Sequence, residues 1–403
     1  MPKNSSTTAP LHERKKKQDE IYESLLADIQ GEKVAVGSLL PSTRQLAKHF
    51  GTSLTPVNLA LRRLESQSYV ETIHGSGVVV RAASTTESEI RLRPLVEVVT
   101  SLSGQFQEGA VSPGLVPVHN LYAAQEWLLW SLRERPGLRM RTCVITRSWA
   151  EQQLREILNE AMVFKPAVLA LPLAEDFSDE TLACLREVRK GGTRPVLRTN
   201  KRDAPDFDRV YSNFRQGQCD LTSYLLEKGC RQILRVTGNT NLFYEQQKQK
   251  GFEDSLMTIG ISSSQAREWT ILLPDLPSKA SGSERTSFWA KLLRPVLKIR
   301  PSLDAVMTVS DMDAVSAQLA LAKMGRGDIE VTGYDNDWPE RRDELEALYG
   351  ETAFSRLKQP ASVDTMLREF GVAMADLVFD CAFGQVAHDQ IQVRTVRQSL
   401  VVP

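Results

Sequence analysis

The chain has 403 residues, of which 41% are hydrophobic and 25% charged, and its 50 lysines and arginines balance 50 aspartates and glutamates. This composition is typical of a soluble globular protein, and the length exceeds what one compact core usually holds, so we expect two or three folding units. No apolar run of about 18 residues is present to span a membrane, and the lysine-rich start lacks the apolar segment of a secretory signal. Five scattered cysteines, none in a C-x-x-C pair, argue against a zinc site and for reduced thiols in the cytoplasm.

Residues 1–17 are polar and lysine-rich, and we expect them to form a disordered tail. Residues 18–81 predict three helices followed by a β-hairpin. Ser42 and Gln45 have the spacing of a capping box at the start of the second helix, and Ser53 is placed to cap the third. The sequence therefore predicts a small α+β unit at this end of the chain.

Residues 82–93 are small, polar and charged, and we interpret them as a linker. Over 94–403, short apolar strands alternate with amphipathic helices, which is the pattern of βαβ units and a parallel sheet. The predicted strands are Leu95–Val99, Thr142–Thr146, Ala167–Leu171, Pro195–Leu197, Gln232–Val236, Ala305–Val309 and Glu330–Thr332. The predicted helices include 151–162, 178–190, 215–228, 246–259 and 312–323. A body of about 300 residues is too long for one sheet of ordinary size, so we expect two lobes.

A motif series runs through residues 39–80: Leu-Pro-Ser-x-Arg-x-Leu-Ala, a Gly-x-Ser turn, an Ala-Leu-x-x-Leu helix and Gly-x-Gly-x-x-Val. In this order and spacing, the segment resembles the GntR family of bacterial regulators. The resemblance implies a winged helix-turn-helix that places its second motif helix in the major groove of DNA.

By position, the resemblance assigns DNA contacts to Arg44, Thr55, Pro56, Asn58, His74 and Gly75. The arginine and the wing backbone are expected to hold phosphates, and the three residues of the third helix to face bases. The family often has arginine at Leu54 and Asn58, so we expect an unusual operator, in which Asn58 could read adenine. Two further arginines, Arg62 and Arg63, are expected on a solvated helix face. The alternative is a winged helix used for protein contact.

Further along, residues 209–336 resemble the effector domain of LacI-type repressors. The stretches that carry this resemblance are Arg209–Val236, 248–261, 301–325 and 329–336, the last containing Gly-Tyr-Asp-Asn at the end of a strand. The likeness is weak over 94–160. A GntR-type head on a LacI-type body is the arrangement of arabinose-type repressors, and it implies a two-lobed α/β periplasmic-binding-protein-like domain with parallel sheets.

Ligands of open parallel sheets bind beyond the carboxyl ends of the strands. The ligand-binding positions implied by the resemblance are Asn200, Lys248, Ser310 and Asp335. Asp335 keeps the family pattern, whereas Lys248 replaces an arginine and lacks its planar fork. Ser310 stands where asparagine is common. Lys248 could instead be a solvated surface residue, and Trp338 is a candidate to stack on a sugar ring.

These features predict a homodimeric, cytoplasmic transcription repressor that binds double-stranded operator DNA and a small-molecule effector, most simply a carbohydrate, between its lobes. The alternatives are a GntR-headed sensor of a non-sugar metabolite and a GntR head on an enzymatic body. We expect no catalytic residue, cofactor, metal or membrane partner. No nucleophile elbow, zinc-binding helix or P-loop motif occurs, and His119 and His388 are the only histidines of the body.

Overall fold

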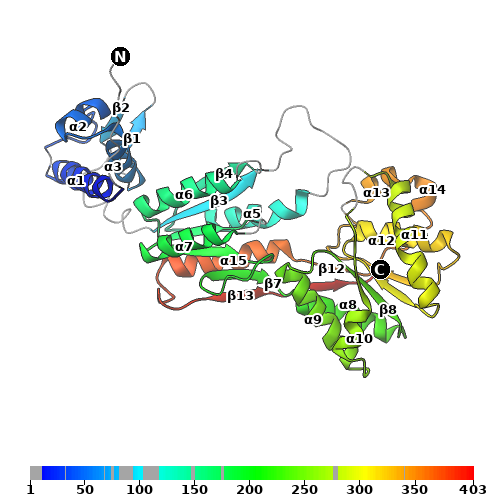
Figure 1. Cartoon of the computed structure of the whole chain (residues 1–403). Helices are drawn as coiled ribbons and strands as arrows, with labels where there is room; N and C mark the ends of the chain where they lie inside the picture. Colours follow the sequence, from blue (N-terminus) through cyan, green and yellow to red (C-terminus); the bar gives the residue numbers. More distant parts are fainter. Residues whose placement is uncertain are drawn as a thin grey trace, which may run out of the picture.

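The computed structural model describes residues 11–31, 33–67, 69–73, 77–80, 94–102, 118–146, 150–173, 177–275, 280–339 and 341–403. The predicted linker 82–93 and the wing residues His74 and Gly75 lie outside these ranges. Figure 1 shows a small N-terminal head, a middle lobe and a distal lobe, which we call the head, the N-lobe and the C-lobe. The predicted fold class, a winged-helix head followed by a two-lobed α/β domain, is confirmed.

The head consists of α1 (Leu11–Gln30), α2 (Thr43–His49), α3 (Leu54–Ser66), β1 (Val70–Ile73) and β2 (Gly77–Val80). The two strands pair antiparallel, and apolar residues of all three helices form one buried core. Ser42 and Gln45 make the predicted capping box, whereas Ser53 occupies the cap of α3 without a side-chain hydrogen bond.

The start of α1 corrects the predicted tail. Residues 11–17 are helical rather than disordered. The segment is rich in lysine and arginine, which favour helices, and Lys17 pairs with Glu20 one turn later at 3.0 Å.

The N-lobe is built on a six-stranded parallel sheet in the order β13-β7-β6-β5-β3-β4. Its elements are β3 (Leu95–Leu102), α5 (Val118–Arg133), β4 (Arg139–Thr146), α6 (Ala150–Phe164), β5 (Val168–Leu171), α7 (Asp179–Lys190), β6 (Arg194–Arg198), β7 (Asp208–Ser212), α15 (Leu367–Ala382) and β13 (Val393–Val396). One buried cluster packs α5 and α15 on one face of the sheet, and a second packs α6 and α7 on the other.

The C-lobe has a four-stranded parallel sheet in the order β11-β10-β8-β9. Its elements are α8 (Phe214–Glu227), β8 (Ile233–Thr237), α9 (Phe243–Met257), α10 (Ser263–Glu268), β9 (Thr270–Leu272), α11 (Gly282–Ile299), β10 (Ala305–Met307), α12 (Asp311–Lys323), β11 (Glu330–Thr332), α13 (Arg342–Tyr349) and α14 (Glu351–Phe354). Helices α8 to α10 cover one face, and α11 and α12 the other. Gly251 lets α9 pack closely on α8, because a Cβ there would lie 2.2 Å from the Arg215 carbonyl oxygen.

The chain crosses between the lobes three times, after β7, after β12 (Ser362–Asp364) and between β13 and β14 (Ser399–Val401). Strands β12 and β14 pair antiparallel at this junction. Two-lobed domains joined in this way bind ligands between the lobes, so the strand ends that face the junction are the place to look for a site.

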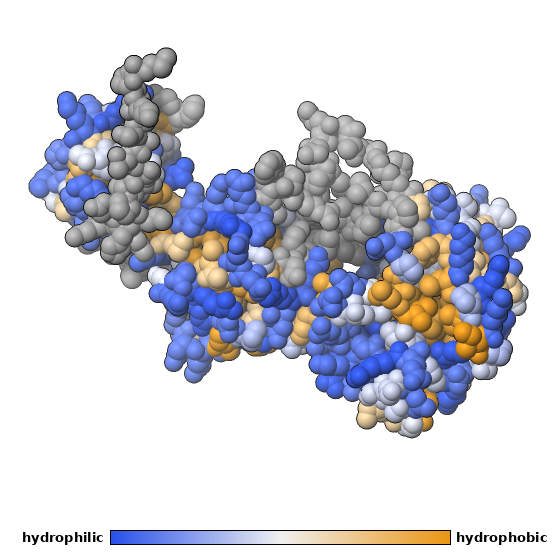
Figure 2. All heavy atoms as spheres, viewed as in Figure 1, coloured by the Kyte–Doolittle hydropathy of each residue, from blue (hydrophilic) through white to orange (hydrophobic). Residues whose placement is uncertain are grey.

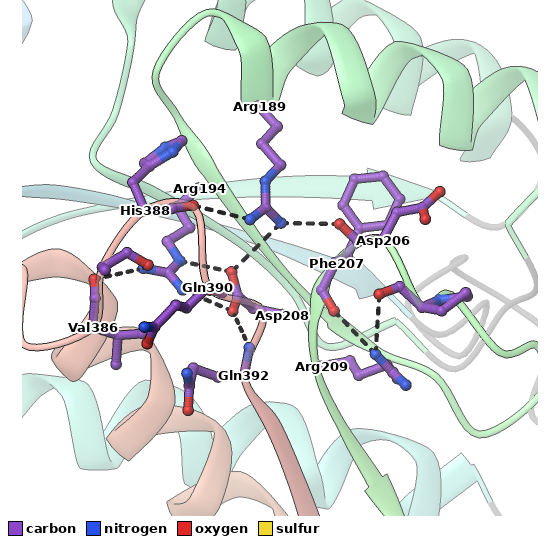
Figure 3. A network of polar contacts seen from close by, with 12 residues as sticks. Arg189, Arg194, Asp206, Phe207, Asp208, Arg209, Val386, His388, Gln390 and Gln392 are labelled. Carbon is purple, nitrogen blue, oxygen red and sulfur yellow. Dashed lines mark hydrogen bonds and ion pairs between the residues drawn. The ribbon is translucent and has the colours of Figure 1, made fainter.

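A buried ion pair within the N-lobe holds the loop between α15 and β13 (Figure 3). Asp208 is fully buried and accepts hydrogen bonds from Arg194 at 2.6 and 2.9 Å and from the main-chain N–H of Gln392 at 2.7 Å. The same guanidinium donates to the carbonyls of Val386, Ala387 and Gln390. These bonds tie the loop before β13 to the amino ends of β6 and β7.

Candidate DNA interface and ligand cleft

Helix α3 presents two of the predicted base-reading residues to solvent. Thr55 and Asn58 are exposed and lie three residues apart, on one face of the helix. Arg44 is exposed on α2. Pro56, by contrast, is buried in the first turn of α3, so the prediction that it faces bases does not fit its position. The head thus offers a polar face on α3 beside a cation on α2.

Of the two arginines near the end of α3, Arg62 is exposed, as expected for a solvated helix face, whereas Arg63 is only partly exposed; both make ion pairs. Arg62 lies 3.1 Å from Glu160 of α6. Arg63 lies 2.9 Å from Asp19 and stacks 3.7 Å above the ring of Tyr22, both on α1.

In the C-lobe, Lys248 is buried, which excludes its interpretation as a surface residue. Its Nζ lies 3.4 Å from the ring centroid of Tyr334, and the rings of Tyr244 and Phe214 complete the cage at 5.5 and 5.7 Å. Burial lowers the pKa of Lys248, while Glu245 and Asp335 oppose that shift. The lysine is therefore a desolvated cation held among aromatic faces.

A buried ion pair underlies this cage, and sequence reasoning missed it. Arg235 of β8 donates to Glu245 at 2.7 Å, and the Thr237 hydroxyl donates to the same oxygen at 2.6 Å. The other carboxylate oxygen of Glu245 lies 3.9 Å from Nζ of Lys248. Glu245 therefore balances two buried cations. Its position three residues before Lys248 on α9 is the only signal that the sequence offers.

Asp335 follows β11 in a backbone conformation that few residues adopt, with φ of 84°. The loop is held in place because Gly333 packs against Asp311, where a Cβ would lie 2.0 Å from its Oδ1, and because the Asp335 N–H donates to the Val363 carbonyl at 2.9 Å. Burial raises the pKa of the Asp335 carboxyl to about 6, and Lys248 opposes the shift. The structure thus brings Lys248 and Asp335 within electrostatic reach of each other.

Ser310 has a structural partner. Its hydroxyl caps α12 by accepting from the Asp313 N–H at 3.2 Å and donating to the Asp313 carboxylate at 2.7 Å. Its contact with a ligand stays a prediction.

Trp338 is buried and stacks on Phe354 with ring centroids 4.8 Å apart, so it belongs to a small core rather than to a surface on which a sugar ring could stack.

Asn200 lies where the N-lobe meets the C-lobe. Its side-chain oxygen accepts from the Ser212 N–H at 3.0 Å, and its main-chain carbonyl accepts from the Tyr244 N–H at 3.0 Å. The adjacent Lys201 carbonyl accepts from the Phe243 N–H at 2.8 Å. The end of β6 is therefore hydrogen-bonded to the start of α9, the helix that carries Lys248.

Three buried polar groups at this junction have no hydrogen-bond partner among the described residues. They are the hydroxyls of Thr199 and Ser212 and the side-chain nitrogen of Gln398. The oxygen of Gln398 accepts from the hydroxyl of Tyr334, whose ring contacts Lys248. Buried polar groups without partners are costly, and a polar ligand or water would satisfy them.

The head and the body each match a family model. The family described as "Bacterial regulatory proteins, gntR family" matches residues 17–80. The family described as "Periplasmic binding proteins and sugar binding domain of LacI family" matches residues 178–398, more than half of the chain. The chain belongs to this LacI-type family. It carries a GntR-type helix-turn-helix head and is a transcriptional regulator with a ligand-binding domain.

Solved structures share the fold of the LacI-type body. A regulatory protein of the LacI family from Chloroflexus aggregans is 15% identical, with a TM-score of 0.55 over 76% of this chain and 96% of that one. The complex of the transcriptional regulator CelR with cellobiose is 17% identical, with a TM-score of 0.53 over 90% and 99%. A LacI family regulator from Enterococcus faecium with bound ribose is 15% identical, with a TM-score of 0.51 over 76% and 97%. No curated protein matches the chain by sequence.

The LacI-type family model begins at residue 178, although the structure shows that β3, α5, β4, α6 and β5 complete the N-lobe before that point. Within the described ranges, none of the helices combines the length and apolar character needed to cross a bilayer. Nor do the described His, Cys, Asp and Glu side chains gather in threes to hold a metal ion.

Proposed function

We propose that this regulator is a repressor that binds operator DNA through its head and responds to a small polar ligand bound between its lobes. The observation that carries the proposal is that Lys248 and Asp335 lie within electrostatic reach of each other beyond the carboxyl ends of the C-lobe strands. This pair lies beside the junction with the N-lobe, where buried hydroxyls have no partner among the described residues. Binding across such a junction favours the closed arrangement of the lobes, and its differential affinity can be transmitted to the heads.

A carbohydrate or related polyol suits this chemistry. Asp335 supplies a carboxylate that can accept from two hydroxyls, and Lys248 supplies a donor. Solved structures with the same fold include one regulator in complex with cellobiose and another with bound ribose. A non-sugar metabolite with an anionic group is the second candidate, favoured by the buried lysine in place of a forked arginine.

DNA binding should depend on Arg44 and Thr55 in different ways. We expect Arg44→Ala to weaken binding to all sequences alike and to lower the salt slope by about one, since it removes one phosphate contact. We expect Thr55→Ala to relax preference at one operator position, at a cost of roughly 1–3 kcal/mol if it removes a base contact. Mobility-shift titrations at several salt concentrations, with a duplex selected from a random library, measure both effects.

Gln152→Ala, which removes no charge at an exposed site on α6 of the N-lobe, serves as the control in that experiment. Unchanged affinity in both head variants would mean that the head does not read DNA. Gly75→Val in the predicted wing should also weaken binding, because a β-branched residue does not fit a tight turn.

A homodimer formed by the body would place two heads on an inverted-repeat operator. The support is two exposed apolar side chains on the N-lobe: Trp130 of α5 is 54% exposed, and Val144, in the outer strand β4, is 48% exposed. Figure 2 shows a further apolar area on the C-lobe. We expect Trp130→Glu to shift the mass in sedimentation equilibrium from dimer to monomer, while Met257→Glu, at an equally exposed site on α9, leaves it unchanged. A monomeric wild type with full operator affinity would contradict the dimer.

A further inference from the structure

The predicted reading helix α3 is docked on the N-lobe by its carboxyl-terminal half. Thr55, Asn58 and Arg62 are exposed and follow one another at intervals of three and four residues, so they share one face of the helix. On this face, Arg62 donates to the Glu160 carboxylate of α6 at 3.1 Å. Helices α3 and α6 contact each other, as can be followed in Figure 1. The face that would meet DNA at one end therefore meets the N-lobe at the other.

A second bond lies one turn further along α3. Arg139, at the start of β4, donates to the main-chain carbonyl of Ser66, the last residue of the helix. Carbonyls at the end of a helix lack partners within it, and a guanidinium there also complements the helix dipole. Two arginines pointing in opposite directions thus join the head to the N-lobe.

On the N-lobe side of this contact, a chain of ion pairs holds Glu160 in position. The second oxygen of Glu160 lies 2.6 Å from Arg141, which in turn lies 3.6 Å from the fully buried carboxyl of Glu97. The Cys143 thiol donates to that carboxyl at 3.0 Å. Arg141 thus fixes the position of the Glu160 carboxylate from within the N-lobe, so that its other oxygen is free to accept a hydrogen bond from the head.

We propose that Arg139, Arg141 and Glu160 form a head-docking patch that holds α3 in the DNA-free protein and competes with DNA for Arg62. A guanidinium engaged with a carboxylate cannot make the same charge-assisted bonds to a phosphate. Undocking also removes the negative charge of Glu160 from the neighbourhood of the duplex. The N-lobe thereby sets the resting DNA affinity of the head. This inference rests on the proposed binding of DNA by the head.

The test uses the full-length chain and a duplex selected by the wild type from a random library. Glu160→Gln and Arg139→Gln each remove one docking bond without touching the head. Each should tighten DNA binding by about two- to fivefold, because Glu160→Gln removes a partly exposed ion pair and Arg139→Gln removes a charge-assisted bond to a main-chain carbonyl. Glu156→Gln is the matched control, because Glu156 is exposed one turn earlier on α6 and its amide partner Gln152 lies on the same helix. Its affinity should equal that of the wild type.

A measurement without DNA separates this inference from the proposed function. In small-angle X-ray scattering, the Glu160→Gln/Arg139→Gln double variant should show a larger radius of gyration than the wild type, with unchanged melting of the body. A wild type that selects no duplex would overturn DNA binding by the head and the competition with it. The docking patch alone would be overturned if the wild type binds DNA and the double variant has the DNA affinity or the radius of gyration of the wild type.

Discussion

Asp208→Ala should lower the free energy of unfolding of the N-lobe by about 3–5 kcal/mol, the usual cost of leaving a buried charge without its partner. Arg194 and Asp208 are both almost fully buried, and the carboxylate accepts three hydrogen bonds (Figure 3). Removing the Asp208 carboxylate leaves the buried charge of Arg194 without its counterion and the Gln392 N–H without an acceptor. The loop that leads into β13 should loosen at the same time.

The matched control lies two residues away. Asp206 pairs with Arg186 at 2.8 Å, but both side chains are about half exposed. Asp206→Ala should therefore cost less than about 1 kcal/mol. Urea denaturation followed by tryptophan fluorescence compares the two variants, because Trp127 and Trp130 report on the N-lobe. Equal losses would show that burial does not set the strength of the Arg194–Asp208 pair.

Local signals in the sequence predicted the regular parts of the fold. The capping box of Ser42 and Gln45 depends on residues three apart, and the structure contains it. The strand Glu330–Thr332 was predicted with the bounds that are observed. Strands β12 and β14 were not predicted. They have three residues each and owe their conformation to pairing across 35 or more residues of chain, which no local pattern encodes.

In the candidate site, too, residues in local motifs were predicted and contacts between distant parts of the chain were not. Lys248 and Asp335 were found because each stands in a motif of the LacI-type family. The contact of Tyr334 with Gln398 joins residues 64 positions apart, and that of Arg62 with Glu160 joins residues 98 apart. Both depend on how separately folded units meet. Periodicity predicted Arg62 on an exposed helix face correctly, but it could not show that Glu160 of the N-lobe accepts a hydrogen bond from it.

Asp335→Ala should abolish the response of operator binding to ligand while leaving ligand-free DNA binding intact. A coupling of 1–3 kcal/mol, a typical value, corresponds to about a 5–150-fold change in operator affinity, and the variant should lose that change. Asp335→Asn is the sharper variant, because asparagine tolerates the φ of 84° that would strain alanine, yet carries no charge. Asp343→Ala, at an exposed site on α13, is the control.

Calorimetry against a panel of monosaccharides, disaccharides and polyols, with operator binding measured in parallel, tests this prediction. In the ligand-free protein, burial raises the pKa of the Asp335 carboxyl to about 6. The group is therefore ionised above that pH and protonated below it. If the ligand needs the carboxylate as an acceptor, its affinity should therefore fall as the pH is lowered through about 6, with Asp335→Asn insensitive over the same range. A panel member that binds wild type and both Asp335 variants equally well would show that Asp335 does not contact the ligand, and would place the pocket elsewhere.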